Sequence, residues 1–168
     1  MNRHISFMVV LIMCILVCNV SQAITYYVTD LGTIGGERSN PSAINAYGQA
    51  VGWSPNTDGD SRAFLYTGST MTDLGTLGGK HSGAKDINDS AQVVGYSYTT
   101  GNAAYRAFLY SGSTMTDLGT LSGTNSFANG INDSGQVVGE ANIAGDTTWH
   151  AFLYSGSKMT DLGTLGGT

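Results

Sequence analysis

Ala63-Phe64-Leu65-Tyr66, followed by a four-residue turn and Met71-Thr72-Asp73-Leu74, is the stretch that decides the fold of this chain. The same pattern returns at residues 107–118 and 151–162. The aspartates that close the pattern are spaced by 43, 44 and 44 residues, at Asp30, Asp73, Asp117 and Asp161. A fixed period of about 40–45 residues indicates a repeat architecture.

Each repeat also carries an Ile-Asn pair that is followed by Val-Gly, so that it reads as two β-hairpins. In the first repeat the strands of the first hairpin are Ala43–Asn45 and Ala50–Trp53. Asn, Asp and Gly in the connecting segments favour a type I turn that ends in a bulge with a positive φ. Ala91 stands where the sister repeats have Gly48 and Gly135, so we expect mild backbone strain there.

Four short strands per period of about 44 residues are typical of a propeller blade. The run Ala63–Tyr66 is apolar without alternation, which indicates a strand covered on both faces. The sequence therefore predicts an all-β fold, a β-propeller-like array of about three four-stranded blades that forms an incomplete propeller. The alternative is a β-solenoid, although its coils are usually shorter and need no two tight turns per repeat.

The repeat register runs over about 30–72, 73–116 and 117–160, and a fourth unit starts at 161–168. Thr25–Thr29 has the β-branched and aromatic composition of a strand. Closed propellers have four or more blades. We therefore expect either a longer array or a small assembly that closes by association. The terminal repeats keep Phe64, Leu65, Phe152 and Leu153 instead of polar caps, which predicts self-association through open blade faces.

Residues 1–23 are typical of a secretory signal peptide, with a predicted helix, Arg3 in a short basic region, an apolar run and Ser21-Gln22-Ala23 before the cleavage site. A retained membrane anchor and a lipoprotein signal at Cys18 are the alternatives. Cleavage leaves one β-repeat domain, 24–168, without Cys14 and Cys18 and therefore without disulfides. We expect this domain to be secreted or held at the cell surface, with no membrane span.

The charge balance argues against nucleic acid as a partner. The chain has 7 Lys and Arg against 12 Asp and Glu, a net charge of −5, and charged residues make up only 11% of it. Nucleic-acid binding calls for clustered basic residues.

Residues that occur in only one repeat are the better candidates for a site, because residues present in every copy build the scaffold. The segments between the two hairpins, 54–62, 97–106 and 141–150, vary most and concentrate aromatic residues. Loops on a rigid scaffold often carry binding. The candidate ligand-binding residues for a glycan or a protein at the cell surface are Trp53, Tyr96, Tyr98, Tyr105, Trp149 and His150. The alternative is that these rings cover the blade edges.

No residue set has the character of a catalytic site. His81 and His150 lie far apart in sequence, and we interpret both as surface or packing residues. Asp58 and Asp60 are weak candidates for a surface calcium site, and a plain turn is the alternative. The repeated aspartates are expected to bind turn amides. We expect no cofactor and no enzymatic activity. The alternative is a carbohydrate-active propeller enzyme, for which Glu37 and Glu140 are the available glutamates.

Three blocks that recur in order resemble the bacterial HAF family of probable extracellular repeats. They are Ile-Asn-Asp-Ser-Gly-Gln-Val-Val-Gly, Ala-Phe-Leu-Tyr and Asp-Leu-Gly-Thr-Leu-Gly-Gly, and the resemblance covers residues 30–168. Only His150-Ala151-Phe152 matches the His-Ala-Phe after which the family is named; the earlier copies have Arg62 and Arg106 in place of the histidine. The resemblance implies a secreted or surface protein and no established activity.

Overall fold

Twelve strands in three antiparallel four-stranded sheets make up the fold in the computed structural model, which describes residues 25–166. The predicted signal peptide, with its helix, lies outside the described residues. The strands are β1 (Asn40–Ile44), β2 (Ala50–Pro55), β3 (Ser61–Tyr66), β4 (Met71–Asp73), β5 (Gly78–Ile87), β6 (Val93–Thr99), β7 (Tyr105–Ser111), β8 (Thr114–Asp117), β9 (Ser122–Ile131), β10 (Val137–Ile143), β11 (Trp149–Ser155) and β12 (Lys158–Gly163). A short 3-10 turn, η1 (Thr100–Asn102), joins β6 to β7.

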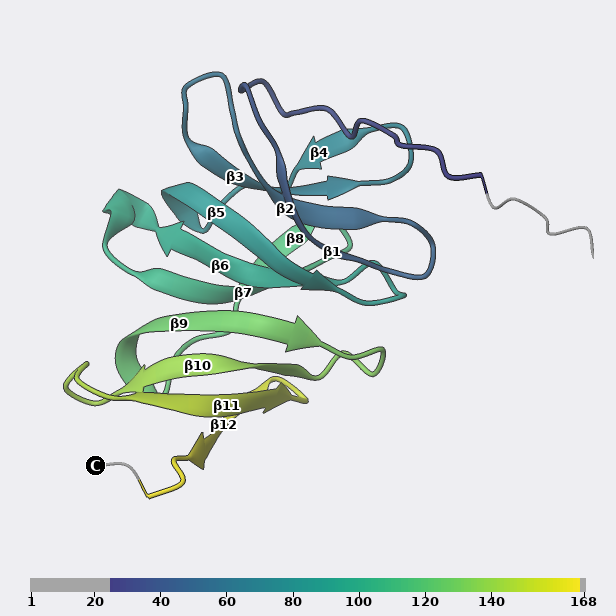
Figure 1. Ribbon diagram of the computed structural model, residues 1–168. Coiled ribbons are helices and arrows are strands. Elements are labelled where there is room, and N and C mark those ends of the chain that lie inside the picture. Colours follow the sequence, from purple (N-terminus) through teal and green to yellow (C-terminus); the bar gives the residue numbers. More distant parts are fainter. Residues whose placement is uncertain (1–24, 167–168) are drawn as a thin grey trace, which may run out of the picture.

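Each sheet is a simple meander in which neighbours in sequence are neighbours in space. Sheet 1 is β1–β4, sheet 2 is β5–β8 and sheet 3 is β9–β12. The three sheets are stacked one after another, as Figure 1 shows, and they do not close into a barrel. The predicted all-β class and the four strands per repeat are therefore confirmed. The antiparallel pairing within each sheet differs from the parallel coils of a β-helix.

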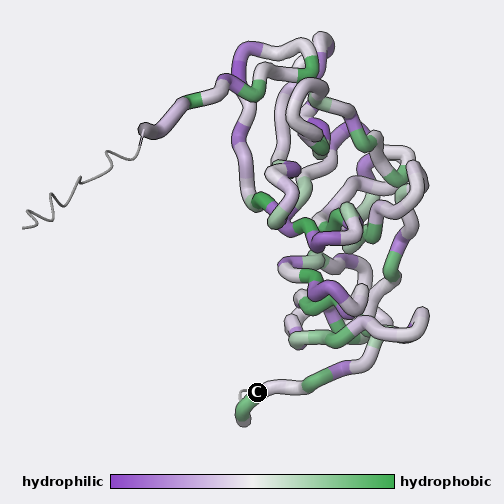
Figure 2. The backbone as a smooth tube through the Cα atoms, turned by 90° about the vertical axis from the view of Figure 1, so that its right-hand side faces the viewer, coloured by the Kyte–Doolittle hydropathy of each residue, from purple (hydrophilic) through white to green (hydrophobic). Residues whose placement is uncertain are grey.

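The hydrophobic core lies between the sheets in two similar layers. In the first junction, Val51, Ala63 and Leu74 of sheet 1 pack against Ile87, Val93 and Phe108 of sheet 2. The second junction repeats this arrangement, and its members are Val94, Ala107, Leu118, Ala128, Val137, Ala141 and Phe152. In Figure 2, hydrophobic stretches alternate with hydrophilic ones within the stacked body. Stacking, rather than any single sheet, therefore buries the apolar side chains.

In sheets 1 and 2 the Ala-Phe-Leu-Tyr strand is covered on both faces, as its continuous apolar pattern predicts, whereas in sheet 3 Ala151 of the third copy is exposed. Along β7, Phe108 packs into the first junction whereas Ala107 packs into the second. This follows from the alternation of side chains along a strand. Phe64, Phe108 and Phe152 are each 0% exposed, so all three rings belong to the core.

The outer side of sheet 1 is covered by the segment that precedes β1. Phe64, Ala50 and Tyr66 form a third cluster, against which Leu31 and Ile34 pack. Phe152 points inward to the second junction. Neither terminal phenylalanine therefore lies on an open face, because Phe64 is covered locally and Phe152 faces the neighbouring sheet. Self-association through the ends of the stack stays a prediction.

The turn of the first hairpin has the predicted geometry in all three sheets. In sheet 2, Asn88 N donates to Gln92 O at 3.1 Å and Ala91 N donates to Asn88 O at 3.0 Å. Ala91 has φ 57°, where Gly48 and Gly135 both have φ 73°. The predicted positive φ at Ala91 is confirmed, and a side chain in this region carries a steric cost that glycine avoids.

Two segments at the ends of the described chain differ from the sequence-based expectation. The strand predicted at Thr25–Thr29 is absent, because no neighbouring strand lies beside it, and Tyr26, Tyr27 and Val28 are exposed. Asp161 lies within β12, so it belongs to sheet 3 although the repeat register starts a new unit there. Among the described residues, no helix is long and apolar enough to cross a membrane.

Candidate binding surface

A row of aromatic rings runs across sheets 2 and 3 at the outer edge of the second junction. Tyr98 and Tyr105 lie 4.1 Å apart between ring centroids, and Tyr105 lies 5.3 Å from Phe127. Phe127 in turn lies 5.5 Å from Trp149 and 5.4 Å from Tyr96. His81 extends the row, with its ring 5.7 Å from that of Tyr98. We call these six side chains the aromatic row.

The strand alternation of β6 places two of the rings on one face. Val94, Tyr96 and Tyr98 share a side of the strand, and Val94 is part of the second core layer. Ser97 lies between the tyrosines in sequence, points the opposite way, and accepts a 2.8 Å hydrogen bond from Leu77 N. The aromatic row is therefore the outward continuation of the core between sheets 2 and 3.

The surroundings of Tyr96 and Tyr105 favour the neutral form of these two phenol groups. Tyr98 and Tyr105 share a hydrogen bond between their hydroxyl groups. This bond, together with burial, raises the pKa of Tyr105 to about 12. Burial, followed by the proximity of Tyr98, also raises the pKa of Tyr96. At neutral pH the surface therefore presents uncharged rings with hydroxyl groups that can donate and accept hydrogen bonds.

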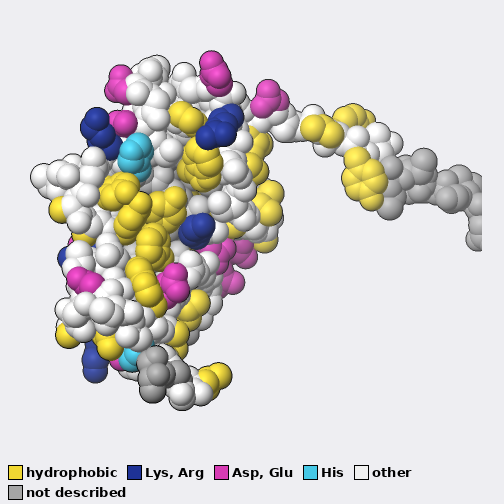
Figure 3. Space-filling view, turned by 60° about the vertical axis from the view of Figure 1, so that its left-hand side comes forward, with side chains coloured by type: hydrophobic (Ala, Val, Ile, Leu, Met, Phe, Trp, Pro, Cys, Tyr) yellow, Lys and Arg dark blue, Asp and Glu magenta, His cyan; other side chains and the backbone are white. Residues whose placement is uncertain are grey.

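A shallow pocket of about 380 Å³ opens beside the row, lined by Lys85, Tyr96, Tyr105, Phe127, Asn129 and Glu140. The ammonium of Lys85 lies 5.8 Å from the centre of the Tyr96 ring, within the range of a cation–π contact. Figure 3 shows hydrophobic side chains gathered in a band down this face of the molecule, with basic and acidic groups beside it. Apolar walls with a few polar groups are typical of a ligand site.

Four of the six predicted binding residues, Tyr96, Tyr98, Tyr105 and Trp149, meet in this row. Trp53 lies apart and stacks under the guanidinium of Arg38, 5.0 Å from it. Within residues 25–166 no ring contact joins Trp53 to the row.

His150 also lies outside the row: its Nδ1 is 2.9 Å from an Asp161 carboxylate oxygen. The pKa of Asp161 is lowered by the hydrogen bond from Gly163 N and then by the one with His150. The sequence does not predict that His150 contacts Asp161 or that Trp53 lies apart from the row, because both depend on how the strands pair.

Sequence reasoning missed Phe127, His81 and Lys85 as members of the site. All three lie on β5 or β9, the first strands of their sheets, and not in the variable segments that drew attention. A usable signal was present: Phe127 replaces Gly83 at the sister position, so this ring occurs in one repeat only. A singleton aromatic within a repeated strand is thus as informative as one within a loop.

The repeated aspartates bind turn amides, as predicted. The Oδ1 atoms of Asp30, Asp73, Asp117 and Asp161 each accept a hydrogen bond from the amide two residues on, at 2.7–2.9 Å. Asp58 and Asp60 belong to a turn in which both of their amides donate to Asn56 Oδ1. Asp60 also lies 3.8 Å from Arg62. In the described part of the chain, no three His, Cys, Asp or Glu side chains converge as a metal site would need.

Chemically, the row can hold a ligand by ring contact and by hydrogen bonds at its edge. Lys85 donates, Glu140 accepts and Asn129 does both. Searches with protein-family models, against curated proteins and against solved structures found no match for this chain.

Proposed function

We propose that this chain is a secreted or cell-surface β-repeat protein of the HAF type that binds a glycan along the aromatic row. Its sheets are the blades of a propeller-like array, and the array serves as a rigid support. The predicted signal peptide supports export, and the low share of charged residues, 11% of the chain, fits an extracellular binding module. The role is binding rather than catalysis.

The observation that carries this proposal is the continuity of the aromatic row with the polar pocket beside it. Sugar rings expose C–H groups on their faces and hydroxyl groups on their edges. Partly exposed aromatic rings can cover the C–H faces, while Lys85, Asn129 and Glu140 bind the hydroxyl groups. Trp149, which is 40% exposed, offers the largest accessible ring of the row.

The composition of the pocket supports binding over glycoside hydrolysis. Most glycosidases use two carboxyl groups that flank the scissile bond. Of the residues that line the pocket, Glu140 is the one acid. We therefore expect saturable glycan binding without turnover.

A fluorescence titration tests the proposal, because the chain has only two tryptophans, Trp53 and Trp149. In a Trp53→Phe variant, Trp149 becomes the sole tryptophan reporter. We expect soluble cell-envelope oligosaccharides, screened first on a glycan array, to change its emission in a saturable way. Trp149→Ala removes this reporter, so its affinity is measured by isothermal titration calorimetry; binding should weaken at least tenfold, which corresponds to about 1.4 kcal/mol.

Trp53→Ala is the matched control, since it removes a tryptophan outside the row. It should leave the affinity unchanged. Equal loss of affinity in both tryptophan variants, or no saturable binding to any glycan tested, would contradict the proposal. Release of reducing ends during the titration would favour the enzyme alternative.

A further inference from the structure

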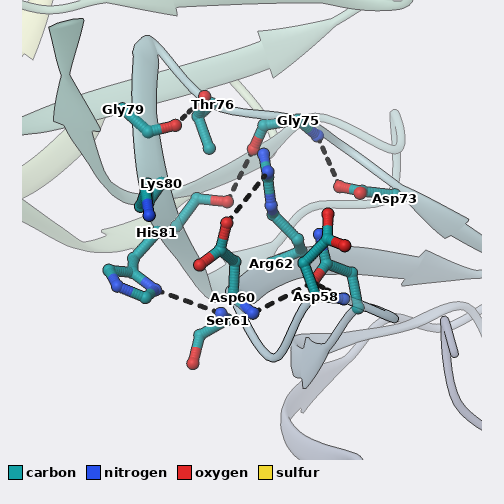
Figure 4. A network of polar contacts seen from close by, with 12 residues as sticks. Asp58, Asp60, Ser61, Arg62, Asp73, Gly75, Thr76, Gly79, Lys80 and His81 are labelled. Carbon is teal, nitrogen blue, oxygen red and sulfur yellow. Dashed lines mark hydrogen bonds and ion pairs between the residues drawn. The ribbon is translucent and has the colours of Figure 1, made fainter. Parts of the chain in front are cut away.

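The two junctions between the sheets share one set of five hydrogen bonds. At the first junction Ala63 N donates to Ser82 Oγ at 2.9 Å, and that hydroxyl donates to Gly75 O at 2.6 Å. At the second junction Ser126 Oγ takes the same place between Ala107 N, at 2.9 Å, and Gly119 O, at 2.5 Å. Figure 4 shows Gly75 and the neighbouring residues of the first junction from close by.

The remaining three bonds of the set come from the edges of the junctions. Ser61 N donates to His81 Nδ1 at 3.1 Å, a contact seen in Figure 4, and Tyr105 N donates to Asn125 Oδ1 at 3.0 Å. The hairpin turns are stacked as well, through Asn45 Nδ2 to Asn88 O and Asn88 Nδ2 to Asn132 O, both 3.0 Å. Ala46 N binds Asp89 Oδ1 and Asp89 N binds Asp133 Oδ1, again at 3.0 Å.

The outer side of sheet 3 presents the same groups that sheets 1 and 2 use to hold a following sheet. We call this side the open face; it carries Asn132, Asp133, Val138, Ala151 and Leu162. Val138 is 47% exposed, although its sisters Val51 and Val94 are 0% exposed in the junctions. Leu162 is 57% exposed, whereas Leu74 and Leu118 are each 6% exposed.

The open face is incomplete in its polar groups too. Asn132 Nδ2 binds only Gln136 Oε1 among the described residues, whereas Asn45 and Asn88 use the second N–H to reach the next turn. An occupant that completes the set must offer a turn carbonyl, a carboxylate at the position of Asp89 and a hydroxyl at the position of Ser82.

The first sheet of a second copy does not offer this set. Ala46 stands at the position of Asp89 and has no carboxylate, and Arg38 stands at the position of His81 and has no acceptor in its side chain. Leu31 and Ile34 also already fill the place on sheet 1 that Leu162 and Leu165 would need. Head-to-tail stacking of identical chains is thereby disfavoured at both the polar and the apolar contacts.

We propose that the open face is a docking surface for a further sheet of this repeat type, one that carries Ser, Asn and Asp at the positions of Ser126, Asn132 and Asp133. The sheet docks as sheet 3 docks on sheet 2. It buries Val138, Ala151 and Leu162, and its Asp accepts a hydrogen bond from Asp133 N. This surface is independent of the aromatic row and of any glycan.

A chain extended in register tests the proposal. A copy of residues 125–168 is fused directly after Thr168, which keeps the 44-residue period. Amide hydrogen exchange is then compared at Asp133 in the extended and the original chain. We expect the Asp133 amide to be protected on the order of tenfold or more in the extended chain. Unchanged exchange at Asp133 overturns the proposal even where the added unit fails to fold.

Two variants show whether the protection comes from the predicted contacts. Val138→Asp should abolish it in the extended chain but barely change the stability of the original chain, in which Val138 is half exposed. In the second variant, Ala replaces the residue of the added unit that corresponds to Asp133. This change should remove the protection of the Asp133 amide. A different outcome is that the Asp133 amide is already protected in the original chain by an oligomer that forms as the concentration rises and that Val138→Asp dissociates. In that case a second copy occupies the open face, and the proposal is wrong.

Discussion

The first and second junctions are alike inside and different at their outer edges. Inside, the two share Val, Ala, Leu and Phe at sister positions and the same serine bridge between an amide and a carbonyl group. At the edge, the second junction has the aromatic row, whereas the first has Pro55, Ser61 and Gly83 where the second has Tyr98, Tyr105 and Phe127. The comparison teaches that repeated residues build the stack and that single residues on its edge give one junction a surface of its own.

The largest expected effect tests the likeness of the two interiors. Phe108→Ala in the first junction and Phe152→Ala in the second should each cost about 3–5 kcal/mol, because each removes a fully buried ring. Urea unfolding of both variants measures the loss. Clearly unequal costs would show that the two junctions do not contribute alike.

A smaller effect concerns the serine that bridges each junction. Ser82→Ala and Ser126→Ala should each cost about 1–3 kcal/mol, since each leaves an amide and a carbonyl without their partner. Ser39→Ala is the matched control, because this sister residue comes directly before β1 of sheet 1, which has no preceding sheet among residues 25–166. A comparable loss in the control would mean that the serine acts within its own sheet.

The turns allow a stabilising change. Ala91→Gly should raise the unfolding free energy by about 0.5–1 kcal/mol, because it relieves a positive φ that both sister turns assign to glycine. Gly135→Ala should lower it by a similar amount. Thermal melts of the two variants give the sign, and a lower melting temperature for Ala91→Gly would show that the positive φ carries no cost there.

The smallest expected effect is on the pH dependence of stability, and it comes from the Tyr98–Tyr105 pair, which has no counterpart at the edge of the first junction. The pKa of Tyr105 is about 12 in the folded chain against 10.0 ordinarily, so the unfolded chain loses this proton first as the pH rises. Stability from the Tyr98–Tyr105 bond is therefore complete below about pH 10 and is lost between pH 10 and 12. Tyr105→Phe should flatten this part of the profile.

Tyrosinate absorbance provides the independent check on that titration. The raised pKa values of Tyr96 and Tyr105 should give the wild-type protein a late phase of tyrosine ionisation. This phase should lose amplitude in Tyr105→Phe and keep its amplitude in Tyr47→Phe, which removes an exposed ring elsewhere. An unchanged late phase in Tyr105→Phe would assign it to other tyrosines.

The sequence by itself determined the scaffold. Its period predicted three units of four strands, the Asn-Asp-Ser-Gly pattern predicted the turns with a positive φ at Ala91, and the unbroken Ala-Phe-Leu-Tyr run predicted a strand covered on both faces. These features depend on local backbone preference and on side-chain alternation. Both act over a few residues and are repeated three times, so each copy supports the interpretation of the others.

Only the tertiary structure decided which single residues meet. Phe127 joins Tyr105 and Trp149 because sheet 3 stacks on sheet 2 with a particular offset, and no local pattern encodes that offset. The same holds for Trp53, which the stack leaves with Arg38, and for Thr25–Thr29, whose strand-like composition finds no neighbour to pair with. Local sequence fixes how a strand forms, whereas contacts between sheets depend on how whole layers pack.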